Sequence, residues 1–193
     1  MGLRARDRQP GRICRYSFGS ALMLDNAVRR LFQNPGKILG GLVREGMTAI
    51  DIGCGPGMFT LAMARLAGPT GKVIAVDLQQ EMLDRLRTKS DRFGLTPRIA
   101  FHRNTPDSLG IDTKADFILS FYMVHEVPDQ VRFFREVRGL LKPGGKYLIV
   151  EPKFHVSWPA FAETVERARR SGLALIESPR ITLSRAALFE VSS

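Results

Sequence analysis

The sequence predicts an α/β fold, a three-layer sandwich in which helices cover both faces of a seven-stranded, mostly parallel sheet with an antiparallel last strand. Short apolar runs alternate with helical patterns from Thr48 onward, the order typical of parallel strands joined by helices. One run, residues 49–52, leads into the turn Gly53-Cys54-Gly55-Pro56-Gly57 and then into an apolar helix. The last two apolar runs are only about ten residues apart, too few for a parallel crossover.

The chain before the first strand is expected to form a separate helical segment. Residues 22–32 carry apolar residues at the spacing of one helix face. Asn34 and Pro35 then indicate a helix start, because Asn is a preferred N-cap and Pro is favoured at the first helical position. We therefore expect residues 1–45 to cap the ligand edge of a core domain that spans residues 46–193.

In the core, each expected strand is a short apolar run and each expected helix presents an apolar face. The expected strands are residues 49–52, 73–76, 99–101, 117–119, 147–150, 173–176 and 187–191. The expected helices are residues 58–66, 81–93 and 159–170, and one with Val131, Phe134, Val137 and Leu141 on its buried face. Helix stops are expected at Gly68-Pro69, at Gly94 and at Lys142-Pro143-Gly144-Gly145. Five parallel strands followed by a closing hairpin follow from this order.

Composition fits one globular domain and excludes several classes of protein. The chain has 193 residues, 44% of them hydrophobic and 25% charged, which is ordinary for a globular protein. No apolar run is long enough to span a bilayer, and the N-terminus lacks the apolar stretch of a signal peptide. Cys14 and Cys54 have no metal or disulfide spacing, so we expect no metal site and a cytoplasmic location. The net charge of +10 is spread along the chain, which favours a solvated basic surface over a nucleic-acid footprint.

Asp51 lies within the first expected strand, between Ile50 and Ile52, Asp77 ends the second, and a glycine-rich turn follows the first strand. Four segments carry the pattern in order, at residues 50–57, 76–83, 116–127 and 140–148. With the closing hairpin, they resemble the class I S-adenosylmethionine-dependent methyltransferases. The match is to the small-molecule group (type 11/25-like) that includes the quinone-biosynthesis and arsenite enzymes. The resemblance implies a Rossmann-like fold, S-adenosyl-L-methionine as cofactor and methyl transfer as the activity.

The resemblance also assigns cofactor-binding residues. They are Asp51, Gly53, Cys54, Gly55, Gly57, Asp77, Leu78, Met82, Asn104, Thr105, Ser120 and Phe121. By resemblance, the glycines permit backbone approach to the methionine and ribose, while Asp51 orients the loop and binds the amino end. Asp77 takes both ribose hydroxyls, Leu78 and Met82 enclose the adenine, and the backbone at Ser120 meets the ammonium.

Thr105 departs from the family pattern, because many relatives carry there an Asp that meets the adenine amino group. Asn104 or Thr105 is then expected to supply that hydrogen bond. His125 is the histidine nearest the expected cofactor edge and is the candidate general base, with local packing or capping as the alternative.

The methyl acceptor is not readable from these motifs. The Asp/Asn-Pro-Pro-Tyr/Phe signature of amino-group methylation is absent after the fourth strand, and two cysteines are too few for arsenite. An O, C, S or N atom of a small molecule is therefore expected as acceptor, in a pocket lined by Tyr16, Phe18, Tyr122 and Phe154. Ordinary packing is the alternative for these four aromatic residues.

Two other functions stay open, namely an RNA-directed methyltransferase and a non-catalytic S-adenosylmethionine-binding partner subunit. The basic balance and the arginine-rich start suggest the first. A nicotinamide oxidoreductase is less consistent with the chain, since the turn lacks the Gly-x-Gly-x-x-Gly spacing.

Overall fold

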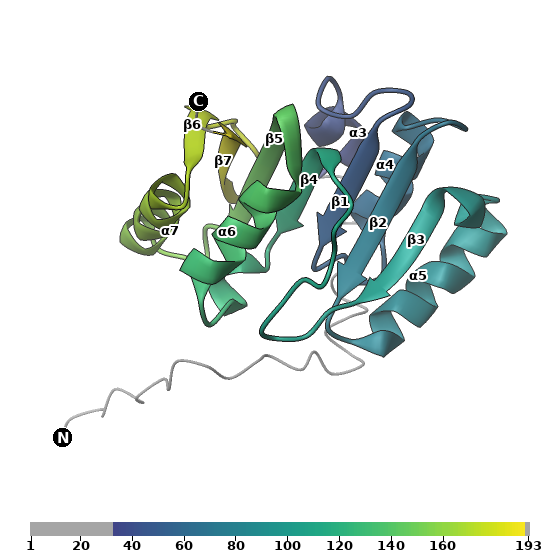
Figure 1. The fold of residues 1–193 in the computed structure, drawn as a ribbon, viewed down its shortest axis with the longest axis horizontal. Helices are drawn as coiled ribbons and strands as arrows, with labels where there is room; N and C mark the ends of the chain where they lie inside the picture. The colour runs from purple at the N-terminus through teal and green to yellow at the C-terminus, as the bar shows by residue number, and fades with distance from the viewer. Residues whose placement is uncertain (1–32, 192–193) are drawn as a thin grey trace.

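The structure, a computed structural model, describes residues 33–191 as a seven-stranded sheet between two layers of helices (Figure 1). The strands are β1 (Thr48–Ile52), β2 (Lys72–Asp77), β3 (Ile99–Arg103), β4 (Ala115–Phe121), β5 (Leu141–Pro152), β6 (Leu173–Glu177) and β7 (Ser184–Val191). The helices are α3 (Pro35–Leu39), α4 (Met58–Leu66), α5 (Gln80–Arg92), α6 (Gln130–Leu140) and α7 (Trp158–Arg170). Short 3₁₀ turns occur at η1 (Thr96–Arg98) and η2 (Val124–Glu126).

The expected sheet is confirmed, including its antiparallel last strand. The strand order is β3-β2-β1-β4-β5-β7-β6, and the pairs from β3 to β5 are all parallel. Strand β7 pairs antiparallel with both β5 and β6 and so lies between them. Only six residues, 178–183, separate β6 from β7, so the chain reverses directly instead of crossing over the sheet.

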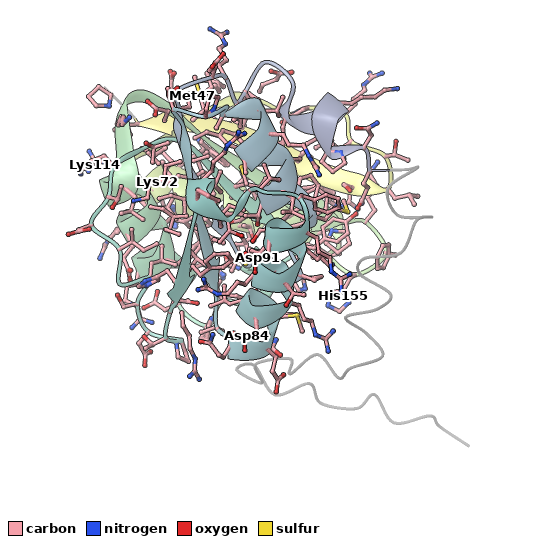
Figure 2. The ribbon with its side chains drawn as sticks, turned by 90° about the vertical axis from the view of Figure 1, so that its right-hand side faces the viewer. Met47, Lys72, Asp84, Asp91, Lys114 and His155 are labelled. Carbon is pink, nitrogen blue, oxygen red and sulfur yellow. The ribbon has the colours of Figure 1, made fainter. Side chains whose placement is uncertain are left out.

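Two apolar cores cover the two faces of the sheet, as alternation along the strands requires. In β1, Ala49 belongs to the core shared with α3, α4 and α5, whereas Ile50 and Ile52 belong to the core shared with α6 and α7. Strands β1, β2 and β4 are almost continuously buried because helices cover both of their faces. Figure 2 shows α5 toward the viewer. Met47 and Lys72 lie at the top, where β1 and β2 begin, and Asp84 lies at the opposite end of the strands.

The buried face of α6 differs from the expected one. Val131 is 37% exposed, and Leu141 begins β5 instead of completing the helix. The buried side chains are Gln130, Phe133, Phe134, Val137 and Leu140. This face is centred on Val137, and at 100° per residue Val131 lies about 120° away from it around the helix.

The segment before the core is described only from Gln33. Helix α3 starts as expected, with Asn34 as N-cap accepting a hydrogen bond from the Lys37 amide, and Pro35 as its first residue. The helix expected at 22–32 lies outside the described residues. None of the helices within residues 33–191 is long and apolar enough to cross a membrane.

Candidate active site

A pocket opens at the carboxyl ends of β1, β2 and β4. From β1 the chain continues to β2 and β3 on one side of the sheet, and it then returns to β4 on the other side of β1. The pocket lies at this topological switch point, which is the usual place for a ligand in an open α/β sheet. Its wall consists of residues 51–56, 58–59, 77–79, 82, 104–109, 121–123, 126–129, 132–133 and 136.

The glycine turn between β1 and α4 forms the floor of the pocket, and its three glycines have different surroundings. All have positive φ, 72° at Gly53, 51° at Gly55 and 90° at Gly57. A Cβ added at Gly53 would lie 2.8 Å from Met123 Cγ, and one at Gly57 would lie 2.1 Å from Leu86 Cδ1. A Cβ at Gly55 would meet nothing within 4 Å. Gly53 and Gly57 are therefore needed for close packing, whereas Gly55 leaves room for a ligand beside its backbone.

Asp77 holds the glycine turn in place. Its Oδ2 accepts the Gly55 amide at 2.9 Å, and its Oδ1 accepts the Gln79 amide at the same distance. Burial raises the pKa of Asp77, although these backbone hydrogen bonds act in the opposite direction. The loop-orienting role that the resemblance assigned to Asp51 is thus performed by Asp77. Each carboxylate oxygen keeps a lone pair for a further donor in the pocket.

Asp51 is directed instead toward the first turn of α4. It is 2% exposed, and its Oδ2 accepts the Thr60 hydroxyl at 2.5 Å. Burial raises the pKa of Asp51 to about 7, and the nearby charge of Asp77 adds to the rise. Asp51 also lines the pocket, so a cation bound there would stabilise its ionised form. Cys54 is buried, and burial raises the pKa of its thiol, so it fills space in the turn as a neutral side chain.

The loop from β3 to β4 forms the other wall of the pocket and contains Asn104 and Thr105. The Thr105 hydroxyl is used within the loop, since it accepts the Ser108 amide at 3.2 Å. Asn104 donates its Nδ2 to the Thr105 carbonyl at 3.1 Å, which leaves its Oδ1 as an acceptor at the pocket. Leu78 and Met82 face this loop from the end of β2 and the start of α5, and both line the pocket.

Helix α6 fixes this loop through two residues that sequence reasoning missed. Glu136 Oε2 accepts the Leu109 amide at 2.7 Å and the Ser108 hydroxyl at 3.2 Å. Arg132 forms an ion pair with Asp107 at 3.2 Å. Nothing in the sequence marked Glu136 or Arg132, because both lie on the polar side of an ordinary amphipathic helix.

Aromatic rings enclose the pocket at the end of β4. Phe121 stacks on Phe59 with ring centroids 4.2 Å apart and lies 4.5 Å from the Tyr122 ring. Tyr122 has φ of 63°, a conformation that non-glycine residues adopt at some cost. Its hydroxyl lies 2.7 Å from Ser184 Oγ and accepts a hydrogen bond from Gln33 Nε2. Three distant segments, residues 33, 122 and 184, therefore meet at this rim.

Several predicted site residues lie outside the pocket wall. Ser120 is fully buried within the sheet, and its hydroxyl accepts a hydrogen bond from the Tyr147 hydroxyl at 3.0 Å. Phe154 is 80% exposed and touches the pocket only through an edge contact with Tyr122 at 6.4 Å between centroids. His125 does not line the pocket, and its ring Nδ1 lies 2.6 Å from Glu151 Oε2. Tyr16 and Phe18 lie outside the described residues.

The pocket is acidic although the chain is basic. Its wall carries six carboxylates, Asp51, Asp77, Asp107, Glu126, Asp129 and Glu136, and one guanidinium, Arg132. That guanidinium is paired with Asp107. No group of three or more His, Cys, Asp or Glu side chains in the described part of the chain is arranged to hold a metal ion.

Comparison with known proteins links this geometry to one family. Residues 43–178 match the family model described as "Methyltransferase domain". Demethylmenaquinone methyltransferase of Bacillus velezensis is 30% identical over 109 residues, 56% of this chain and 47% of that protein. Ubiquinone/menaquinone biosynthesis C-methyltransferase UbiE of Escherichia coli is 32% identical over 110 residues, 56% of this chain and 44% of that protein. The chain thus spans about half the length of these curated relatives.

Among solved structures, a SAM-dependent methyltransferase from Aquifex aeolicus has the same fold. Its TM-score is 0.82 at 22% sequence identity, over 92% of this chain and 100% of that chain. The two proteins therefore share the same α/β fold.

Proposed function

Because this chain belongs to the class I S-adenosylmethionine-dependent methyltransferases, we propose that it transfers the methyl group of S-adenosylmethionine to an O, C, S or N atom of a small molecule. The observation that carries the proposal is the open space beside Gly55, in a pocket that Asp51 and Asp77 also line. A cofactor with an ammonium at one end and a ribose diol near its centre matches these two acceptors.

The residues of the pocket suit such a cofactor along its length. Asp51 would meet the ammonium and the backbone of the glycine turn the methionine portion. Asp77 would accept the ribose hydroxyls through the lone pairs that Gly55 and Gln79 leave unused. Met82 and the Asn104 side chain would contact the adenine, with Asn104 Oδ1 accepting from the amino group that an Asp accepts in many relatives.

The bound cofactor supplies a methyl carbon already activated by a positively charged sulfur. The protein's task is to align an acceptor in line with that carbon and to exclude water, and alignment alone lowers such barriers by roughly 7–11 kcal/mol in favourable model systems. The rings of Phe59, Phe121 and Tyr122 form the apolar wall that would hold the acceptor.

The cap proposed over this wall is the N-terminal segment, residues 1–45, although none of its described residues, 33–45, lines the pocket. Gln33 supports this arrangement, because its hydrogen bonds to Tyr122 and Ser184 place the start of the described chain at the pocket rim. A cap over a small acceptor would be needed at this rim.

A small acceptor is favoured over RNA by the charge of the pocket. Six carboxylates and one paired guanidinium line it, and a phosphate backbone would be repelled there. The relatives named above act in ubiquinone and menaquinone synthesis, as their names state, which supports a small molecule as acceptor for this chain.

Isothermal titration of the full chain with S-adenosylhomocysteine, and separately with NAD, tests the proposal. Binding of S-adenosylhomocysteine with one site per chain is expected, with no heat from NAD. The variant Lys114→Ala, on the β3–β4 connection away from the pocket wall, serves as control and keeps the wild-type affinity. Binding of NAD without binding of S-adenosylhomocysteine would overturn the proposal. An RNA oligonucleotide that is methylated faster than any small acceptor would replace it by the RNA-directed alternative.

A further inference from the structure

A buried carboxylate, Glu151, contacts two groups of the short turn between β4 and α6. Glu151, near the end of β5, is 1% exposed. Its Oε1 accepts the backbone amide of His125 at 3.1 Å, and its Oε2 lies 2.6 Å from His125 Nδ1. One carboxylate thus fixes both the main chain and the ring of the same residue.

The surroundings of the His125 ring favour its charged form. Burial alone would lower the pKa of His125, but the hydrogen bond and charge of Glu151, with a smaller contribution from Glu126, raise it above the ordinary value. Glu126 Oε1 lies 3.9 Å from His125 Nε2. His155 meets the ring edge-on with centroids 4.8 Å apart. An imidazole whose charged form is stabilised by two carboxylates is less available as a proton acceptor than a histidine with an ordinary pKa.

The turn held by this pair forms part of the pocket wall. Met123, Glu126 and Val127 line the pocket, while His125 between them does not. Met123 packs so closely on the glycine turn that a Cβ on Gly53 would lie 2.8 Å from Met123 Cγ. The described restraints on this turn also include the Gln130 amide, which donates to the Val124 carbonyl at 3.0 Å.

We propose that Glu151 and His125 act as a positioning pair that holds Met123 and the turn at residues 123–127 against the glycine loop. His125 then acts on cofactor binding through the turn, and the general-base role expected for it is not needed. This inference rests on the proposed function, since it concerns the same cofactor pocket.

The pH dependence of binding follows from the direction of the pKa shift. A raised histidine pKa means that the charged pair is intact below that pKa and is lost as the pH rises through it. Asp51 ionises near pH 7 and changes affinity in the opposite direction, and the ligand's amino group also titrates. The informative quantity is therefore the ratio of the S-adenosylhomocysteine dissociation constants of Glu151→Gln and wild type, in which both of those titrations cancel.

The experiment measures this ratio by isothermal titration between pH 5.5 and 9 on the full chain. Glu151→Gln is expected to weaken binding about tenfold at the acid end, because a hydrogen bond to a charged partner is lost. The ratio should fall toward one as His125 of the wild type loses its proton. His125→Gln should show the same loss as Glu151→Gln, and His155→Gln, the matched control on the neighbouring ring, should keep the wild-type affinity.

Proton NMR of the wild type supplies a measurement that needs no variant to fold. The chain has three histidines, His102, His125 and His155, so the His→Gln variants assign their signals. The midpoint of the His125 titration should coincide with the pH at which the affinity ratio falls. Unchanged affinity in both Glu151→Gln and His125→Gln would overturn the inference, as would a ratio that does not vary with pH. If wild type itself does not bind S-adenosylhomocysteine, the proposed function fails instead.

Discussion

At Gly57, one added methyl group should lower the free energy of unfolding for two separate reasons, backbone strain and a steric clash. Its φ of 90° is unfavourable for any residue with a Cβ, by about 1–2 kcal/mol. The added Cβ would lie 2.1 Å from Leu86 Cδ1 and 3.0 Å from Leu86 Cγ, and Leu86 is fully buried. Overpacking of this kind costs about 1–3 kcal/mol. Gly57→Ala should therefore lower the free energy of unfolding by about 2–5 kcal/mol, a large part of the roughly 5–15 kcal/mol of a typical domain.

Urea unfolding followed by circular dichroism measures this loss, and a double-mutant cycle identifies its cause. Leu86→Ala alone is expected to cost about 2–5 kcal/mol, because it leaves a cavity. In Gly57→Ala/Leu86→Ala the new methyl group enters that cavity, so the double variant should be more stable than the sum of the single losses by about 1–3 kcal/mol. Additive losses would show that the contact with Leu86 is not the reason, and a loss below 1 kcal/mol for Gly57→Ala would refute the steric argument altogether.

Gly55→Ala is the matched control for this argument. It has the same backbone cost, about 1–2 kcal/mol, but its Cβ meets nothing within 4 Å. We expect a folded variant that binds S-adenosylhomocysteine at least tenfold more weakly, since the methyl group occupies the cofactor's side of the turn. Wild-type affinity in Gly55→Ala would contradict the placement of the cofactor beside this residue.

Two further predictions concern residues that shape the adenosine end of the pocket. Asp77→Asn should weaken S-adenosylhomocysteine binding about tenfold in isothermal titration, because an NH2 group, which cannot accept, replaces one of the two carboxylate oxygens that accept the Gly55 and Gln79 amides. The free energy of unfolding should change little, since a buried charge is also removed. Glu136→Ala should weaken binding of S-adenosylhomocysteine by releasing Ser108 and Leu109, and Glu136→Gln should restore most of it, because the amide oxygen still accepts both hydrogen bonds. Equal affinities of wild type, Glu136→Ala and Glu136→Gln would show that the loop holds its position without α6.

The fold was predictable because its signals are local. The continuous apolar run of β2, the glycine turn before α4 and the short connection between β6 and β7 each limit the structure within a few residues. Val131 shows where local signals fail. The sequence of α6 is compatible with two apolar faces, one that contains Val131 and one that contains Phe133. Packing on the sheet decides that the face with Phe133 and Phe134 is the buried one.

The site was predictable to the extent that strand ends define it. Asp51, Asp77 and Phe121 follow from the rule that parallel strands end at one edge, and they line the same pocket. The sequence could not show that Asp77 contacts the glycine turn and Asp51 contacts Thr60, because this depends on which donor each carboxylate reaches in the folded chain. Glu136 and Glu151 could not be found from the sequence either, since their partners lie 26 or more residues away along the chain.

Net charge illustrates the same limit for function. The chain has 29 Lys and Arg residues against 19 Asp and Glu, which favoured a solvated basic surface and kept an RNA-directed function open as the alternative. The pocket wall reverses this balance, because it carries six carboxylates and one guanidinium, that of Arg132. The two observations agree if the basic surface and the pocket have separate partners. Salt-sensitive RNA binding that leaves S-adenosylhomocysteine affinity unchanged would support this separation, and competition between RNA and S-adenosylhomocysteine would contradict it.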